Sequence, residues 1–239
     1  ARLDLNGTFG NESNQWVHFD SHPKYTGQDT FFPVEVANRK FSLKALPNKG
    51  DDPKYIKEAL LRFFVKSAFL NTREGKEQEN FSMLIHTSGK NVDHSKDYKD
   101  VMKVISTLRD DTNIAHEALV KEIWELIEKS TGDQDRANKT LSFILDNIGR
   151  CDPVIINSKN DKNKIEYVTN PLSPFTIAIG GNIISRGVTF NNLLSMFFTR
   201  DAKNKIQQDT YIQRARMFGA RGEYLEHFEL AIPEQLYLD

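Results

Sequence analysis

The sequence predicts an α/β fold in which a parallel sheet is covered by helices on both faces. From Pro153 onward, short and fully apolar segments alternate with helical patterns, which is typical of buried parallel strands joined by crossover helices. The length of 239 residues is enough for one large domain with its own hydrophobic core. No internal repeat divides the chain into smaller units.

Residues 1–52 are predicted to be a linker and irregular region. Asn, Gly, Asp and Pro are frequent there, and aromatic patches at residues 16–19 and 31–34 suggest short strands packed on another part of the protein. We therefore place the main domain at residues 53–239.

The first long element of this domain is a helix. Pro53 follows Asp51 and Asp52, and a proline just after a capping residue marks a helix start. Apolar residues then recur at spacings of three and four as far as Leu70. After a polar loop, the compact apolar run at residues 81–86 predicts a buried strand.

Three helical patterns predict a helical insertion at about residues 92–148, which we interpret as an addition at the sheet edge or a docking surface for a partner. The patterns cover about residues 96–109, 114–129 and 135–148. The elements predicted after them are strands at 154–156, 165–168, 175–179 and 194–198, a helix at 208–218 and a closing strand at 227–232.

Composition excludes several classes of protein. Hydrophobic residues make up 38% of the chain with no long apolar run, so we expect no membrane span and no large disordered region. A single cysteine and a polar amino terminus without a secretory signal favour a cytoplasmic location. The first residue is not Met, so we expect the chain to be part of a longer protein.

Charge is distributed unevenly although the net charge is only −1. Residues 180–222 carry seven basic and two acidic side chains, and the stretch from Glu223 onward carries only acidic ones. The basic stretch at residues 180–222 either contacts an anionic partner or lies on a surface that is exposed to solvent.

The most informative segment follows the apolar run that ends at Ile179. Two glycines, Gly180 and Gly181, precede a polar loop that contains Ser185, Arg186 and Thr189. Glycines let the backbone approach a ligand closely, and exposed amides with an arginine favour an anion. We interpret this as a loop facing phosphate or nucleic acid; the alternative is a tight turn with a solvated arginine.

A second polar segment lies at residues 208–221. On a helix, Asp209, Gln213 and Arg216 lie close to one face, and Arg221 follows the glycine at its end. The planar, permanently charged guanidinium is suited to clamping a transferring phosphoryl group. The alternative is that these basic side chains form hydrogen bonds to the free carbonyl groups at the end of their own helix.

Together these segments resemble the Z-one (Z1) domain family of bacterial ATPases, which are related to superfamily 2 helicases and encoded near restriction-modification and defence genes. Weaker similarity covers Tyr25–Gly27 with Phe31–Phe32, Ser82–Ser88 and Asn157–Lys159. Arg214, Ala215 and Met217 depart from the commonest family pattern. The matching residues are Gly180, Gly181, Asn182, Ser185, Arg186, Gly187, Thr189, Asp209, Thr210, Gln213, Arg216, Phe218, Gly219 and Arg221.

The resemblance implies a RecA-like fold and the second ATPase domain of a DNA-dependent, helicase-like enzyme. Arg216 and Arg221 would be arginine fingers, and Gln213 would orient them or the attacking water. The other site residues would contact nucleotide or nucleic acid: Gly180, Gly181, Asn182, Ser185, Arg186, Gly187, Thr189 and Asp209.

The resemblance also implies ATP and Mg²⁺ as cofactors, held mainly by a first domain. This chain has no Walker A loop, because Gly75-Lys76 and Gly89-Lys90 are followed by Glu77 and Asn91. The implied partners are DNA, an upstream ATPase domain of the same protein and restriction or defence proteins.

Another class of function remains open: a noncatalytic DNA- or protein-binding module, or an endonuclease-like subunit. A nuclease core is disfavoured because Glu166 is not followed by the expected lysine, and Cys151 lacks the surroundings of a catalytic thiol. We predict no metal site, although His18, Asp20 and His22 would share one face of a strand.

Overall fold

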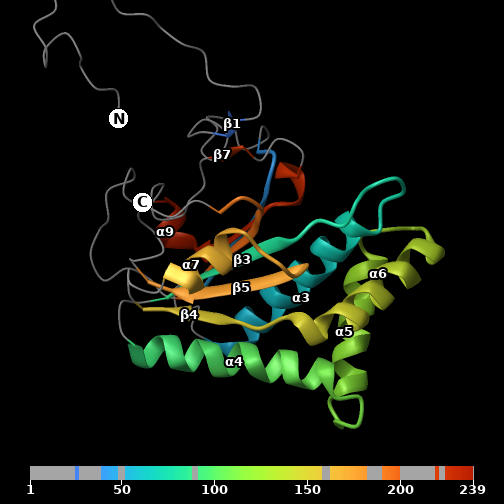
Figure 1. Cartoon of the computed structure of the whole chain (residues 1–239), viewed down its shortest axis with the longest axis horizontal. Helices are drawn as coiled ribbons and strands as arrows, with labels where there is room; N and C mark the ends of the chain where they lie inside the picture. The colour runs from blue at the N-terminus through green and yellow to red at the C-terminus, as the bar shows by residue number, and fades with distance from the viewer. Residues whose placement is uncertain are drawn as a thin grey trace, which may run out of the picture.

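A six-stranded sheet, parallel throughout, forms the centre of the molecule (Figure 1). The computed structural model describes residues 25–26, 39–47, 52–87, 91–157, 162–181, 190–199, 219–220 and 224–238. The strands follow the spatial order β2–β8–β6–β3–β5–β4. Their bounds are β2 Ser42–Leu46, β3 Phe81–His86, β4 Val154–Ile156, β5 Phe175–Gly180, β6 Leu193–Phe198 and β8 Glu229–Pro233.

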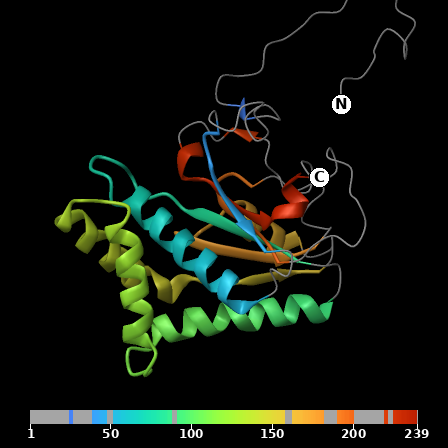
Figure 2. The same cartoon turned by 180° about the vertical axis from the view of Figure 1, so that it is seen from behind.

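Helices cover both faces of this sheet, as the α/β prediction requires (Figures 1 and 2). One face carries α3 (Pro53–Asn71), α4 (Asn91–Arg109), α5 (His116–Glu128) and α6 (Gln134–Asn147). The other face carries α7 (Lys162–Thr169) and α9 (Glu234–Leu238). Short 3₁₀ helices, η2 (Ile148–Arg150) and η3 (Leu225–His227), lead into β4 and β8.

Alternating side chains along the central strands build two cores. Met83 and Ile85 of β3 join the core under α3–α6, and Leu84 between them joins the core under α7 and α9. The larger core includes an aromatic contact between Phe64 of α3 and Phe175 of β5, with ring centroids 5.1 Å apart. This arrangement is consistent with a RecA-like α/β fold.

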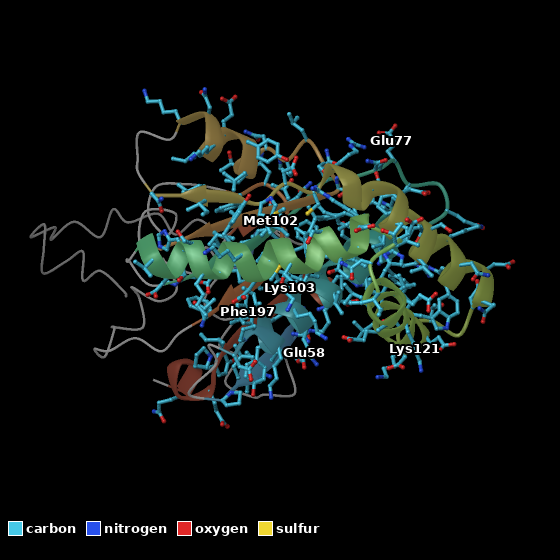
Figure 3. The ribbon with its side chains drawn as sticks, turned by 90° about the horizontal axis from the view of Figure 1, so that it is seen from below. Glu58, Glu77, Met102, Lys103, Lys121 and Phe197 are labelled. Carbon is cyan, nitrogen blue, oxygen red and sulfur yellow. The ribbon has the colours of Figure 1, made fainter. Side chains whose placement is uncertain are left out.

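The helix α3 begins where the sequence predicts. The Asp52 side chain accepts a hydrogen bond from the backbone N–H of Lys54 at 2.9 Å, and Pro53 occupies the first turn. The helix packs against the sheet and against α4, α5 and α6, so ten of its residues are buried. Figure 3 views the molecule from the side of α4, whose exposed Lys103 belongs to the outer surface of this layer.

Two local predictions differ from the structure. The strand predicted at residues 165–168 is instead part of α7, because the helical period places Ile165 and Val168 together against the second core. A four-residue apolar run cannot distinguish these alternatives by itself. Within the stretch 1–52, residues 42–46 form the edge strand β2, whose pairing with β8 depends on a partner far along the chain.

The other predicted elements agree with the structure where it describes them. The helical stretch 92–148 forms α4, α5 and α6, which bury their apolar stripes in the first core, and α4 begins one turn earlier than predicted. The aromatic patches at 16–19 and 31–34 and the helix predicted at 208–218 lie outside the described residues. Among the described helices, none is both long and apolar enough to cross a bilayer.

A buried carboxylate connects the helical layer to the sheet. Glu229, the first residue of β8, is only 1% exposed and accepts hydrogen bonds from Arg62 Nε at 2.8 Å and Lys66 Nζ at 2.9 Å. Burial alone would raise the pKa of Glu229, but the charges of Lys66 and Arg62 and their hydrogen bonds hold it below its ordinary value. The carboxylate therefore stays ionised in the folded protein.

We predict that Glu229→Ala lowers the free energy of unfolding by about 3 kcal/mol or more, because it removes the buried carboxylate that pairs with two partly buried cations. The matched control is Glu58→Ala. Glu58 also contacts Arg62, at 3.8 Å, but its side chain is 53% exposed, so we expect a change within about 0.5 kcal/mol. Equal effects in urea unfolding of the two variants would contradict the central role of Glu229.

The same contact predicts a component of acid sensitivity. Because the folded pKa of Glu229 lies below the unfolded value of 4.5, its stabilising contribution is present above pH 4.5 and is lost as the pH falls through the folded pKa. The stability difference between the wild type and Glu229→Gln should therefore be largest near neutral pH and shrink in acid. Unfolding curves at a series of pH values measure this difference, and a constant difference would argue against the assignment.

Candidate functional site

The carboxyl edge of the sheet is the candidate site. The neighbouring strands β3, β5 and β6 end in register, with His86 opposite both Gly180 and Phe198. Because all strands are parallel, the residues that follow them gather at this same edge. Ligands of open α/β sheets bind beyond such strand ends.

Backbone hydrogen bonds hold these three strand ends together. The Thr87 N–H donates to the Gly180 carbonyl at 3.1 Å, and the Thr199 N–H donates to the His86 carbonyl at 3.1 Å. The His86 ring lies against the Phe198 ring, with centroids 4.9 Å apart. The edge is therefore a fixed platform rather than a set of independent loops.

A polar cluster adjoins this platform where α4 begins. Asp93, His94 and Asp97 in the first turns of α4 are all buried. The Nδ1 atom of His94 is hydrogen bonded to Oδ1 of Asn157, which directly follows β4. Because Asn157 stands in a segment with family similarity, this contact connects that segment to α4.

A small hollow opens between the start of α3, α4 and the end of β6. Its three carboxyl side chains come from α4 and from the residue that caps α3, so the hollow suits a cationic group better than a phosphate. Thr199, 3% exposed, closes it on the side of the sheet. The lining residues are Asp52, Pro53, Ile56, Asp97, Asp100, Phe197 and Thr199.

Two predicted site residues, Gly180 and Gly181, lie in the described structure. Both are buried at the carboxyl end of β5, at the centre of the platform, where the sequence predicts the phosphate-facing loop to start. The remaining predicted residues lie outside the described residues: Asn182, Ser185, Arg186, Gly187, Thr189, Asp209, Gln213, Arg216 and Arg221.

Two stretches with family similarity are brought together by a short antiparallel pair. In this pair β1 (Tyr25–Thr26) lies beside β7 (Gly219–Ala220), with Thr26 opposite Gly219. The stretch around Tyr25 is therefore adjacent to the end of the second polar segment, nearly two hundred residues later in the chain. Sequence spacing alone gives no sign of this pairing.

The sequence does not single out His86 and His94, which the structure places at or beside this edge of the sheet. A signal was available for His86, because it ends an apolar strand in the same position as Gly180 ends β5. No comparable signal exists for His94 or Asp97, since their burial depends on how α4 packs. Among the described residues, no group of three His, Cys, Asp or Glu side chains is arranged to hold a metal ion.

The residues behind the nuclease and thiol alternatives are held in structural contacts. Asp152 accepts a hydrogen bond from Arg109 Nη2 at 2.9 Å, and Glu166 lies on α7 rather than beside a strand. Burial raises the pKa of Cys151 to about 12; Arg109 opposes this shift and Asp152 adds to it. The thiol therefore stays protonated and is a poor nucleophile.

Comparison with known proteins identifies one family. The family model described as the Z1 domain matches residues 55–239 of this chain. No curated protein and no solved structure matches the chain significantly.

We predict that Cys151 reacts with a thiol reagent at pH 8 about a hundredfold more slowly in the native chain than in the unfolded one, because the buried thiol has almost no thiolate. Cys151 is the only cysteine, so the denatured chain is a direct control. Equal rates in native buffer and in denaturant would show that the thiol is accessible and ionised.

Proposed function

Because the chain belongs to the Z1 domain family, we propose that it is the second RecA-like domain of a DNA-dependent, helicase-like ATPase of a bacterial restriction or defence system. In this proposal it completes an ATP site whose phosphate-binding loop belongs to a separate first domain. The observation that carries the proposal is the position of Gly180 and Gly181. They end a central strand of a parallel sheet, and the family motif continues directly from them.

The residues at the carboxyl edge are compatible with an ATP site that two domains share. Gly180 and Gly181 carry no side chain that would block a phosphate beside them, which supports a nucleotide or nucleic-acid contact where the polar segment begins. In our proposal Mg²⁺ is held mainly by the first domain, as the family resemblance implies. ATP with Mg²⁺ supplies the phosphoryl group that is transferred to water.

In this proposal the basic residues of the two polar segments act on phosphate groups. Arg216 and Arg221 neutralise charge that develops on the transferred phosphoryl group, and Gln213 orients them or the attacking water. Ser185, Arg186 and Thr189 line the cleft between the domains and contact the DNA backbone. Asn182, Gly187 and Asp209 complete the nucleotide or nucleic-acid contacts.

A second candidate function is a noncatalytic DNA- or protein-binding module, or an endonuclease-like subunit, of the same kind of system. A parent protein with no Walker A loop upstream of this chain would favour it, because an ATPase needs that loop and a binding module does not. This candidate predicts DNA or protein binding that does not change when nucleotide is added.

The test is DNA-stimulated ATP hydrolysis by the protein that joins this chain to its first domain. We predict that Arg216→Ala or Arg221→Ala lowers kcat about a thousandfold or more without unfolding the protein, because an arginine finger acts in the transition state. Arg150→Ala is the matched control. Arg150 is an exposed arginine that contacts Asn147 and the Leu172 carbonyl, and we expect its variant to keep wild-type turnover.

An intact protein without any ATPase activity, or finger variants as active as the control, would refute the proposed enzyme. DNA-binding measurements with and without ATP would then decide on the second candidate, since only the ATPase predicts that nucleotide changes DNA affinity.

A further inference from the structure

A second hollow lies at the opposite, amino-terminal edge of the sheet. It is formed where α3 ends, the following loop turns back into β3, and the chain approaches η3; these segments adjoin one another in Figures 1 and 2. Its lining combines apolar walls with charged side chains. The lining residues are Leu70, Arg73, Lys76, Glu79, Phe81 and Tyr224.

Two cations, Arg73 and Lys76, line this hollow. In the described part of the chain, neither Arg73 nor Lys76 forms an ion pair, although Glu79 lines the same hollow. A third cation, Arg136 of α6, lies 3.6 Å from the centroid of the nearby Phe69 ring and also has no ion pair there. The lining of the hollow therefore carries two positive charges and one negative charge, because Glu74 and Glu77, which are exposed in the same loop, do not line it.

The contact between Arg73 and His227 keeps the imidazole neutral, so His227 adds no charge to the hollow. The Arg73 Nη2 atom is hydrogen bonded to Nε2 of His227. Because a guanidinium can only donate, Nε2 must accept, so the imidazole is neutral with its proton on Nδ1. Burial lowers the pKa of His227, as do Arg73, Lys66 and Arg136, whereas Glu226 opposes the shift.

The walls of the hollow are held in place by contacts of their own. Asn71 binds the returning loop twice: its Nδ2 donates to the Glu79 carbonyl at 3.0 Å, and its Oδ1 accepts from the Glu79 N–H at 2.7 Å. The Tyr224 hydroxyl donates to the Asn191 carbonyl at 3.0 Å, and its ring packs edge-on against Phe81. Gly75, with φ of 70°, allows the tight turn between Arg73 and Lys76.

We propose that this amino-edge hollow binds a phosphate group, with Arg73 and Lys76 as its donors. An oxyanion offsets the excess positive charge of the lining, and a guanidinium together with an ammonium suits phosphate oxygens. Glu79 opposes the anion and keeps the affinity moderate. The phosphate comes either from a small phosphorylated molecule or from a nucleic-acid backbone, and the site is separate from the proposed ATP site at the other edge of the sheet.

The test is a titration of the 239-residue chain with inorganic pyrophosphate at low ionic strength, followed by calorimetry and by the NMR signals of the His227 imidazole. We expect Arg73→Ala and Lys76→Ala each to weaken binding about tenfold, the loss of one charge-assisted hydrogen bond. Glu79→Gln should strengthen binding. The bound anion should also raise the pKa of His227, because it favours the imidazolium form.

Lys121→Ala is the control for general charge effects. Lys121 is exposed on α5 and lies well apart from Glu77 of the hollow's loop (Figure 3). Lys76 is exposed as well, so its variant should fold normally even if Arg73→Ala does not. Competition by a short single-stranded DNA would assign the phosphate to nucleic acid, and saturable pyrophosphate binding without competition would assign it to a small molecule.

Three results would overturn the proposal. They are the absence of saturable pyrophosphate binding, an affinity that Lys121→Ala lowers as much as Lys76→Ala does, and a Glu79→Gln variant that binds no more tightly than the wild type. None of these results depends on ATP hydrolysis, so the proposed function can fail or stand independently.

Discussion

The buried carboxylate of Glu229 is the contact on which the arrangement of the layers depends. A carboxylate that is removed from water must be paired, and here its two partners come from successive turns of α3. β8 lies between β2 and β6, so the ion pairs attach α3 to the part of the sheet that the chain completes last. The helix is thereby held over the sheet, and α4, α5 and α6 can pack around it to close the larger core.

A consequence of the parallel sheet is that its two edges have different chemistry. The carboxyl edge carries the paired glycines, His86 and an acidic hollow, whereas the amino edge carries a hollow lined by two cations, Arg73 and Lys76, and one carboxylate, Glu79. The strand β3 connects the two edges, since its first residue, Phe81, lines the amino-edge hollow and its last residue, His86, lies at the carboxyl edge. A ligand at one edge therefore need not compete with a ligand at the other.

The predictions from sequence succeeded where a local pattern is sufficient. Asp52 and Pro53 predict the start of α3, because one is a capping residue and the other favours the first turn of a helix. The apolar runs of β3 and β5 are long enough to be recognised as buried strands. The strand prediction for residues 165–168 is wrong because a four-residue apolar run suits a strand as well as a helix, and only packing against the second core decides. The sequence gives no sign of β2 because an edge strand is half exposed and its partner β8 lies far along the chain.

The sequence by itself determined the fold class, the family and the point at which the glycine motif leaves β5, since these depend on residue spacing and type within short segments. Only the tertiary structure decided which distant residues meet. Glu229 and Arg62 are 167 positions apart, and His227 and Arg73 are 154 positions apart. Such pairs cannot be recognised in the local sequence. The energy of a charge depends on its burial and its neighbours, and both are set only when the layers pack.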